Sequence, residues 1–310
     1  MTLIETSCDA EAVLEQLLRA LAANRQPGWN FPGHFLELSF DTVEAGAACV
    51  SLSPGPHCVD SNGRASLAAL GVLADIGMAA SIRHDVGPAV RMATLCMSLN
   101  LTGAPPAGRL ECRSVRDAYV AGATRRTGLS HARIEAGGVL VATGSANFVE
   151  LPGRSIAPMA LRPSSERRVR LLRPDELDAG EQAIYDKARA ALAEKGESFI
   201  DRFWGLTPQA GENGAVCEFE NGPQVGNRVG HTQGGVSFAL AAATAMRALD
   251  GGRRLVGISA WYVRAGTGAR LRAKAELLHQ GGHAAMVRTQ LLGEDGELVM
   301  EALSHHTRST

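Results

Sequence analysis

A chain of 310 residues, 45% of them hydrophobic, is long enough for about two domains of ordinary size, each with its own buried core. Its formal net charge of -1 argues against a general attraction to nucleic acid or to an anionic membrane surface. The chain starts without the basic end and apolar stretch of a signal peptide, and we find no apolar run approaching the roughly 20 residues of a membrane span. We therefore expect a soluble, cytoplasmic protein that binds neither nucleic acid nor membranes.

The cysteines show no C-x-x-C pair, and several lie in apolar, strand-like settings: Cys8, Cys49, Cys58, Cys96, Cys112 and Cys217. This pattern favours reduced, buried thiols over a zinc site or a disulfide framework. The histidines do not combine with a third ligand at metal-binding spacing, and the chain has no phosphate-binding or dinucleotide-binding glycine loop. We expect neither a metal nor a cofactor.

The first elements in chain order are a helix and a hairpin. Apolar residues at helical spacing predict an amphipathic helix over residues 9–24, with Asp9 as its N-cap. A turn over 27–33 leads to two strands of a β-hairpin, over 35–41 and 47–52.

After a loop over 54–64 comes a helix-length apolar run, Ser66 to Ser81, that carries a single acid, Asp75. An ionised aspartate rarely lies inside an apolar helix unless it is paired, hydrogen-bonded or used in chemistry, because removing its water costs several kcal/mol. Asp75 is therefore the first candidate for a functional residue.

Four strands follow this helix, over residues 93–101, 108–115, 127–135 and 139–149. The gaps between them are too short for the helices that parallel strands would need, so the pattern predicts an antiparallel sheet with the helix lying across it, an α+β fold. The next stretch, 152–173, is rich in proline and contains a basic cluster at Arg167–Arg170. We interpret it as a linker whose arginines are solvated or pair with acids.

The remainder of the chain repeats the first part. It has a helix over 178–195, an entry strand over 199–206, its hairpin partner over 214–219, an apolar helix over 233–249, and strands over 257–263, 269–278, 283–292 and 298–305. When the sequence is shifted by 167 positions, Gly63 aligns with Gly230, Ser66 with Gln233 and Asp75 with Ala242. This indicates duplication of a whole domain, with boundaries at 1–151, 152–173 and 174–310.

The loop and helix carry a family resemblance. A loop of the type Asn-x-x-Gly-x-x-His-Gly-Gly, a long helix with an acid nine positions after the His, and then antiparallel strands resemble the hotdog-fold thioesterases of the phenylacetate-pathway and 4-hydroxybenzoyl-CoA types. The second half keeps the loop but has Gln233 in place of the His and Ala242 in place of the acid; its matching residues are Asn227, Gly230, Gly234 and Gly235. The first half keeps Gly63 and the acid Asp75, with Asp60 and Ser66 at the Asn and His positions.

In that family two hotdog units pack side by side, and each site takes its loop from one unit and its acid from the other. The resemblance therefore implies one composite site, with Gln233 and Gly234 of the second half facing Asp75 of the first. The pseudo-symmetric partner site would combine the loop of the first half, with Asp60 and Ser66, and the helix of the second half, with Ala242. It would lack both the acid and the amide donor. We expect one working site per chain, at the seam between the repeats.

The resemblance also implies a reaction, the hydrolysis of an acyl-CoA substrate without a cofactor. Asp75 would act as base or nucleophile, and the backbone N–H groups of Gly234 and Gly235, at a helix N-terminus, would stabilise the developing oxyanion. The remaining assignments by resemblance are Asn227 and Gln233 to orient water or bind the carbonyl, Thr94 to assist the water, and Arg125 and Arg126 to bind the nucleotide of CoA, with a solvated strand end as the alternative for the two arginines. His231 lies two residues from the position of the family's His; it is a candidate to bind substrate, and a loop histidine without a catalytic role is the alternative.

Several alternatives stay open from the sequence. Asp75 would also fit as a structural bridge between the repeats, Asn227 as an ordinary turn residue and the two glycines as packing positions. A non-catalytic acyl-CoA-binding protein is a second hypothesis, and an enoyl-CoA hydratase or dehydratase is a weaker one, because Gln233 and Ser66 occupy the position of the His that such chemistry usually needs. The exposed sheet edges of hotdog units favour a homodimer or a larger homo-oligomer.

Overall fold

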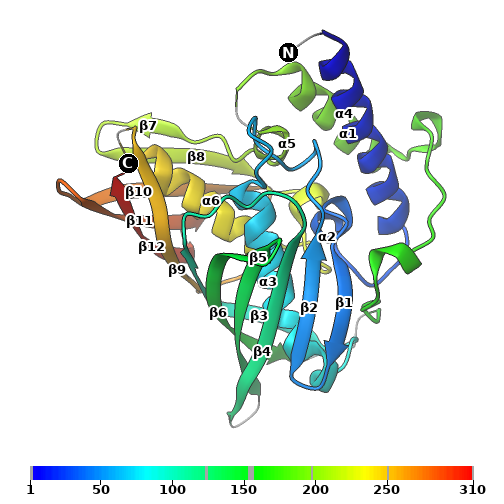
Figure 1. The fold of residues 1–310 in the computed structure, drawn as a ribbon, viewed down its shortest axis with the longest axis horizontal. Helices are drawn as coiled ribbons and strands as arrows, with labels where there is room; N and C mark the ends of the chain where they lie inside the picture. Colours follow the sequence, from blue (N-terminus) through cyan, green and yellow to red (C-terminus); the bar gives the residue numbers. More distant parts are fainter. Residues whose placement is uncertain (1–2, 123–124, 153–156, 197, 250, 309–310) are drawn as a thin grey trace.

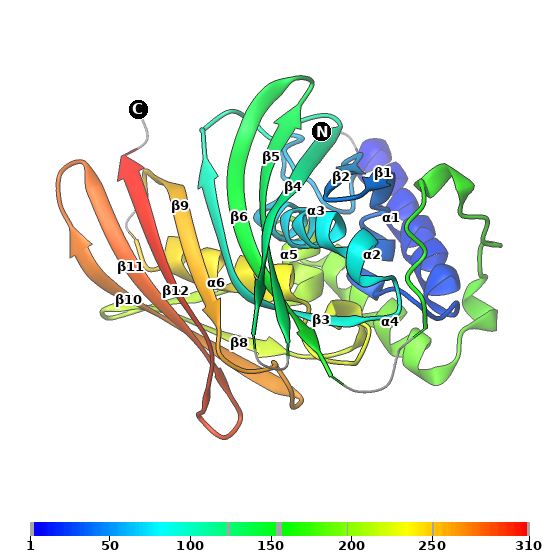
Figure 2. The same ribbon diagram turned by 90° about the horizontal axis from the view of Figure 1, so that it is seen from below.

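A computed structural model describes residues 3–122, 125–152, 157–196, 198–249 and 251–308, with side chains from Asp9 onward. The fold is α+β, with one antiparallel sheet of 12 strands that curls around two central helices (Figures 1 and 2). The predicted fold class is thus confirmed in its main features.

The sheet consists of two halves with the same strand order. The first half supplies β1 (Ser39–Glu44), β2 (Ala47–Leu52), β3 (Arg91–Leu101), β4 (Leu110–Ala121), β5 (Arg126–Ala136) and β6 (Val139–Leu151). The second supplies β7 (Gln209–Gly211), β8 (Gly214–Glu220), β9 (Arg253–Tyr262), β10 (Arg270–Gln280), β11 (Ala284–Gly293) and β12 (Leu298–Arg308). The order across the sheet is β1-β2-β4-β5-β6-β3-β9-β12-β11-β10-β8-β7, so each strand of the first half has a counterpart at the mirrored position.

The two halves join where β3 pairs with β9. Ser98 lies opposite Ser259, and the two hydroxyl groups are hydrogen-bonded at 2.8 Å. Because the strands are antiparallel, a local pseudo-twofold axis passes through this pair. A residue a given number of positions before or after Ser98 corresponds to the residue the same number of positions before or after Ser259. The sheet therefore continues from one half into the other without an edge at the seam.

The two central helices are α3 (Leu67–Val86) and α6 (Gly234–Arg247), which contact one another inside the curled sheet (Figure 2). α3 is long and apolar enough to cross a membrane, with 20 residues and a mean hydropathy of 1.3, which corrects the expectation that no apolar run reaches this length. Of the 18-residue window with that mean hydropathy, 83% is buried inside the protein. Its apolar residues are those of a core helix.

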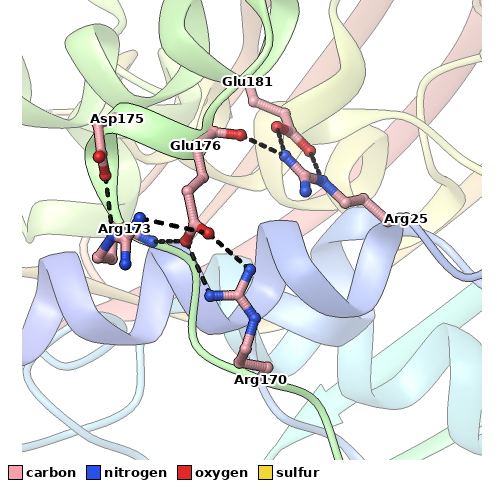
Figure 3. Close-up of polar contacts among 6 residues, drawn as sticks. All are labelled: Arg25, Arg170, Arg173, Asp175, Glu176 and Glu181. Carbon is pink, nitrogen blue, oxygen red and sulfur yellow. Dashed lines mark hydrogen bonds and ion pairs between the residues drawn. The ribbon is translucent and has the colours of Figure 1, made fainter.

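Outside the sheet, α1 (Leu3–Asn24) packs against α4 (Ala179–Ala193), and the two helices belong to different halves. Arg25 ties them together: its guanidinium donates to both carboxylate oxygens of Glu181, at 2.7 and 2.6 Å, and to the carbonyl of Glu176 (Figure 3). Arg170 of the basic cluster pairs with the side chain of Glu176 at 2.7 Å, as the interpretation of an acid-pairing surface expects.

Three predicted elements differ from the structure. α1 begins at Leu3, so Asp9 lies within the helix and is not its cap. The first predicted strand begins later, because residues 31–35 form α2 (Phe31–Phe35), whose N-cap Asn30 accepts a hydrogen bond from the Gly33 N–H at 2.9 Å. The predicted entry strand of the second half is the helix α5 (Phe199–Trp204).

The sequences of α2 and α5 contain signals for the start or end of a helix, but their apolar residues are also typical of a strand. α2 has a proline in its first turn, and α5 begins at the N-cap Ser198 and ends at Gly205, whose φ of 76° is in the left-handed region that favours glycine. Their aromatic residues pack against one another across the two halves, with the rings of Phe35 and Phe203 5.4 Å apart. Tertiary burial of these rings favours the helices over the strands.

The segment between the repeats has little regular structure in its described part, which contains the 3-10 turns η1 (Ser164–Glu166) and η2 (Pro174–Glu176); a third, η3 (Pro223–Val225), precedes α6. β6 ends at Leu151 and α4 starts at Ala179. One hydrophobic cluster includes residues of both halves. The domain boundaries given above stay a prediction, because the halves share their sheet and their core.

The two central helices touch at glycines. A Cβ atom on Gly71 of α3 would lie 2.6 Å from the carbonyl oxygen of Gly235 in α6, and one on Gly235 would lie 2.3 Å from the carbonyl oxygen of Gly71. Backbone atoms cannot move aside as a flexible side chain can. The absence of side chains at these two positions therefore fixes how closely α3 and α6 approach.

We predict that Gly71→Ala destabilises the protein. Alanine gains up to about 1 kcal/mol over glycine inside a helix, but overpacking a tight contact costs about 1–3 kcal/mol, and here the contact is with backbone. Chemical denaturation should give a lower free energy of unfolding than wild type. The matched control is Gly180→Ala in α4, where the new Cβ would be 3.4 Å from its nearest neighbour and the helix should gain stability. Equal stabilisation of both variants would contradict the proposed close contact.

Candidate active site

Asp75 lies in the middle of α3 with 7% of its surface exposed, and three donors surround its carboxylate. The Thr94 hydroxyl of β3 donates to Oδ1 at 2.8 Å, and the Gln233 side-chain Nε2 donates to Oδ2 at 2.6 Å. The backbone N–H of Gly235 also donates to this carboxylate. Two of the three donors come from the second half, so the acid of one repeat meets the amides of the other.

Both polar atoms of the Gln233 side-chain amide make hydrogen bonds. As the N-cap of α6, its Oε1 accepts a hydrogen bond from the Val236 N–H at 2.9 Å, while its Nε2 reaches Asp75. The cap contact fixes the orientation of the amide, so that its N–H points at the carboxylate. Serine at the equivalent position of the first half, Ser66, makes the same cap to the Ala69 N–H but is too short for the second contact.

Burial governs the charge of Asp75. Desolvation raises the pKa of Asp75 to about 6, and the hydrogen bonds from Thr94, Gly235 and Gln233 oppose that rise by favouring the ionised form. A carboxylate with a pKa in this range is ionised at neutral pH and can still take up a proton. It is suited to act as a base or as a nucleophile.

The first residue of α6, Gly234, presents a free donor next to this carboxylate. Its N–H has no acceptor among the described residues, whereas the Gly235 N–H is used by Asp75 and the Val236 N–H by Gln233. A Cβ on Gly234 would lie 3.0 Å from Asp75 Oδ2 and 3.1 Å from Thr94 Oγ1. Glycine therefore leaves room for a ligand atom to approach both the N–H and the carboxylate.

This geometry changes the role expected for Gly235. The sequence suggested that it binds substrate, but its N–H holds Asp75 and its Cα packs against Gly71. Of the two glycine N–H groups expected to stabilise an oxyanion, only that of Gly234 is free in the described structure.

Tyr262, at the end of β9, was not identified from the sequence. Its hydroxyl donates to the carbonyl of Gly234 at 2.7 Å, and burial, together with the nearby charge of Asp75, raises the pKa of Tyr262 well above its ordinary value. The hydroxyl therefore stays protonated and positions the first turn of α6. No sequence signal separates this tyrosine from a residue that simply packs at the end of a strand.

A cavity of about 400 Å³ opens beside these groups. Its wall includes Asp75, Gln233 and Gly234, and it continues along α3 past Ile76 and Ala80 to the aromatic ring of Phe148. The volume lies within the range of small-molecule sites. The catalytic candidates thus line a cavity with a largely apolar extension.

Asn227 builds the loop before α6. Its side-chain Oδ1 accepts hydrogen bonds from the N–H groups of Val229 and His231, at 3.0 and 3.1 Å. Asp60 makes the same turn in the first half, accepting from the N–H groups of Asn62 and Arg64. Asn227 also lines the cavity, but no contact joins it to Asp75. The structure therefore favours the turn role left open above over a role in orienting water.

The other predicted binding residues are divided between the cavity and the surface. His231 and Arg125 line the cavity, and Arg125 is exposed at its rim. Arg126 does not line it: its guanidinium pairs with Glu150 at 2.8 Å and lies over the ring of Tyr119. The structure thus gives Arg126 a structural role in place of the predicted substrate contact.

The pseudo-symmetric counterpart of this site is closed. Counting from the axis pair Ser98 and Ser259, Leu255 takes the position of Thr94 and Leu101 takes that of Tyr262. With Ala242 in place of the acid, these side chains line a void of only about 10 Å³, roughly the space of one water molecule. The second site therefore has neither the polar groups nor the volume for a ligand.

The described cysteines are free thiols, and four of them, Cys49, Cys58, Cys112 and Cys217, are buried; the side chain of Cys8 lies outside the described part. Over the described part of the chain, no three His, Cys, Asp or Glu side chains gather as a metal site requires. The absence of a bound metal stays a prediction.

No protein-family model matches the sequence, and no curated protein matches it either. Solved structures do match. An oleoyl thioesterase (putative) from Lactobacillus plantarum aligns with 86% of this chain and 98% of its own, at 14% identity and a TM-score of 0.56. The 12:0-ACP thioesterase from Umbellularia californica aligns with 85% of this chain and 94% of its own, at 10% identity and a TM-score of 0.53.

A conserved protein of unknown function with a hot dog fold, from Alicyclobacillus acidocaldarius, aligns over 88% of this chain and 96% of its own, at 9% identity and a TM-score of 0.52. At these identities the likeness concerns the fold. Together with the mirrored strand order and the two enclosed helices, it shows that this chain has the hotdog fold, as two tandem hotdog units packed as a pseudo-dimer.

Proposed function

We propose that the protein is an acyl-CoA thioesterase with one active site between its two repeats. The observation that carries the proposal is the pairing of a buried, ionisable carboxylate, Asp75, with the free N–H of Gly234 at the start of a helix, in the wall of a cavity. Thioester hydrolysis needs both a base or nucleophile and a donor for the oxyanion. The names of the fold neighbours support the same reaction class.

In the proposed reaction Asp75 takes a proton from water, and the water oxygen bonds to the thioester carbon. The carbonyl oxygen becomes an oxyanion that accepts a hydrogen bond from the Gly234 N–H, where the dipole of α6 favours negative charge. The C–S bond then breaks, and the proton on Asp75 passes to the CoA sulfur. Direct attack by Asp75 to form an anhydride uses the same geometry and remains the alternative first step.

We predict that Asp75→Asn reduces kcat by a factor of about 10²–10⁴, the usual contribution of a positioned general base. Asparagine has the shape of aspartate and removes a buried charge, so the variant should fold and retain its melting temperature. A free-thiol release assay across aliphatic and aromatic CoA esters measures the activity. Ser66→Ala is the control: it should lose about 0.5–2 kcal/mol of stability as an N-cap and keep full turnover.

An unchanged kcat in Asp75→Asn would remove Asp75 from the mechanism. Binding of acyl-CoA by the wild-type protein without release of thiol would favour the non-catalytic binding protein. Formation of a 3-hydroxyacyl product from an enoyl-CoA would favour a hydratase.

The activity should also depend on pH. Because Asp75 acts in its ionised form and burial raises the pKa of Asp75 to about 6, kcat/KM should rise with pH through a midpoint near 6. Stability should change in the opposite direction. The folded protein holds this proton more tightly than an unfolded chain, where the pKa is 3.8, so this contribution to stability falls as the pH rises from about 4 to about 6. Denaturation of Asp75→Asn over the same window should lack this component.

Thr94→Val tests the hydrogen bond from the Thr94 hydroxyl to the carboxylate of Asp75. The hydroxyl of Thr94 favours the ionised form of Asp75, so its removal should move the midpoint of kcat/KM to higher pH and reduce kcat at neutral pH about tenfold. Thr94→Ser keeps the hydroxyl and should restore the midpoint. A Thr94→Val profile with the wild-type midpoint would show that this hydrogen bond does not control the ionisation of Asp75.

The cytoplasmic location, the absence of nucleic-acid and membrane partners, and a homodimer or larger assembly remain part of this proposal. The outer strands of the sheet, β1 and β7, are the two edges at which further copies of the chain would pair. Light scattering of the purified protein determines the assembly directly.

A further inference from the structure

The cavity beside Asp75 has an unusual charge. Among the described residues that line it are five arginines, Arg83, Arg91, Arg125, Arg228 and Arg264, and a single carboxylate, that of Asp75. Some of these arginines lie at the exposed rim, where solvent screens their charge. Arg83 is buried, and Arg91 and Arg228 are half-buried. Of these three, Arg83 and Arg228 have buried donor atoms without an acceptor among the described residues.

The cavity has an open end and a buried end. Val263 and Leu95 lie at the open end, 55% and 39% exposed. At the other end α3 continues from Asp75 with Ile76, Ala80 and Arg83 in the wall, and Arg83 is only 7% exposed. Arg83 follows Asp75 by eight positions, which corresponds to about 12 Å along a helix. An acyl chain whose thioester lies at Asp75 would point its far end toward Arg83.

Arg83 and Arg228 are held by backbone carbonyls. The guanidinium of Arg83 donates to the carbonyl of Val90, and that of Arg228 donates to the carbonyls of Pro88 and Ala157. These contacts fix the two side chains in place but provide no negative charge. In the described part of the chain no carboxylate pairs with either arginine.

Each of the two arginines also has a donor left over. The Nε–H groups of Arg83 and Arg228 are buried and have no acceptor among the described residues, and the same is true of the indole N–H of Trp29, which lines the same cavity. Burial, and after it the positive charge of Arg228, lowers the pKa of Arg83 to about 10. A buried and a half-buried positive charge near one another, with unused donors, are costly unless an anion joins them.

We propose that the acyl group of the substrate carries a terminal carboxylate, which binds to Arg83 and Arg228 at the buried end of the cavity. The substrate class would then be the CoA esters of dicarboxylic acids. This inference rests on the proposed thioesterase function. A planar carboxylate matches the paired N–H groups of a guanidinium, and a hydrogen bond between charged groups is stronger than one between neutral groups.

A phosphate group of CoA is the other source of negative charge for these arginines. The burial of Arg83 argues against it, because this side chain is only 7% exposed, whereas the phosphates of CoA are attached to a bulky nucleotide. The exposed Arg125 at the rim is better placed for the nucleotide. The two sources predict different responses to the loss of Arg83.

The test compares adipoyl-CoA with hexanoyl-CoA, which have acyl chains of equal length and differ in the terminal carboxylate. The wild-type protein should hydrolyse adipoyl-CoA, or the matched ester at another chain length, with a kcat/KM about 10–100-fold higher than the uncharged ester. Arg83→Gln should abolish this preference by slowing the charged ester alone, and Arg83→Lys should keep part of it. Arg133→Gln, an exposed arginine of β5 paired with Glu135, is the matched control and should behave as wild type.

Loss of activity toward both esters to the same extent in Arg83→Gln, with weaker inhibition by free CoA, would assign Arg83 to a CoA phosphate and overturn the proposal. Arg228→Gln provides the same comparison if Arg83→Gln does not fold, as judged by its melting temperature. Equal kcat/KM values for charged and uncharged esters at every chain length would also overturn the proposal, while leaving thioesterase activity established.

Binding separates this inference from the proposed function. Asp75→Asn should bind both esters without hydrolysing them, and calorimetry should show adipoyl-CoA binding about 10–100-fold more tightly than hexanoyl-CoA. If the wild-type protein releases no thiol from any ester but retains this binding preference, the thioesterase function fails and the carboxylate site stands.

Discussion

The site depends on one hydrogen bond, from the Gln233 side chain to Asp75, between residues 158 positions apart in the chain. It forms only because α3 and α6 approach closely at Gly71 and Gly235. A buried carboxylate without donors would be protonated or would destabilise the fold. The second repeat therefore supplies two of the three hydrogen bonds to Asp75, and it also places the free N–H of Gly234 beside the carboxylate.

The fold is nearly symmetric, but the site is not. At one pseudo-equivalent position a carboxylate, an amide and a hydroxyl line a cavity. At the other, Ala242 and Leu255 replace the carboxylate and the hydroxyl, and almost no space is left. The leucines at this second position keep apolar surface away from water and avoid burying polar groups without partners.

The electrostatics of the candidate site also have two parts. Asp75 is ionisable because hydrogen bonds partly offset its desolvation, and it lies at one end of the apolar extension that ends at Arg83. The arginines make the environment of the cavity positive, which favours anionic ligands as a class. Since the protein as a whole has a net charge of -1, this preference comes from where the charges are placed and not from their sum.

The sequence by itself determined the repeat and the fold class, and it showed that Asp75 and Gln233 lie in different halves. These features can be read directly because apolar periodicity and residue identity are local properties, and both copies of a duplicated domain keep them. It missed α2 and α5, where capping residues and the packing of Phe35 against Phe203 prevail over an apolar run that is typical of a strand. Only the tertiary structure showed that Tyr262 binds the first turn of α6. Only the structure showed that Asn227 holds a turn, that Arg126 pairs with an acid, and that no carboxylate among the described residues pairs with Arg83. These depend on which groups meet after the two halves have packed, and contacts between residues so far apart in the chain leave no periodic signal in the sequence.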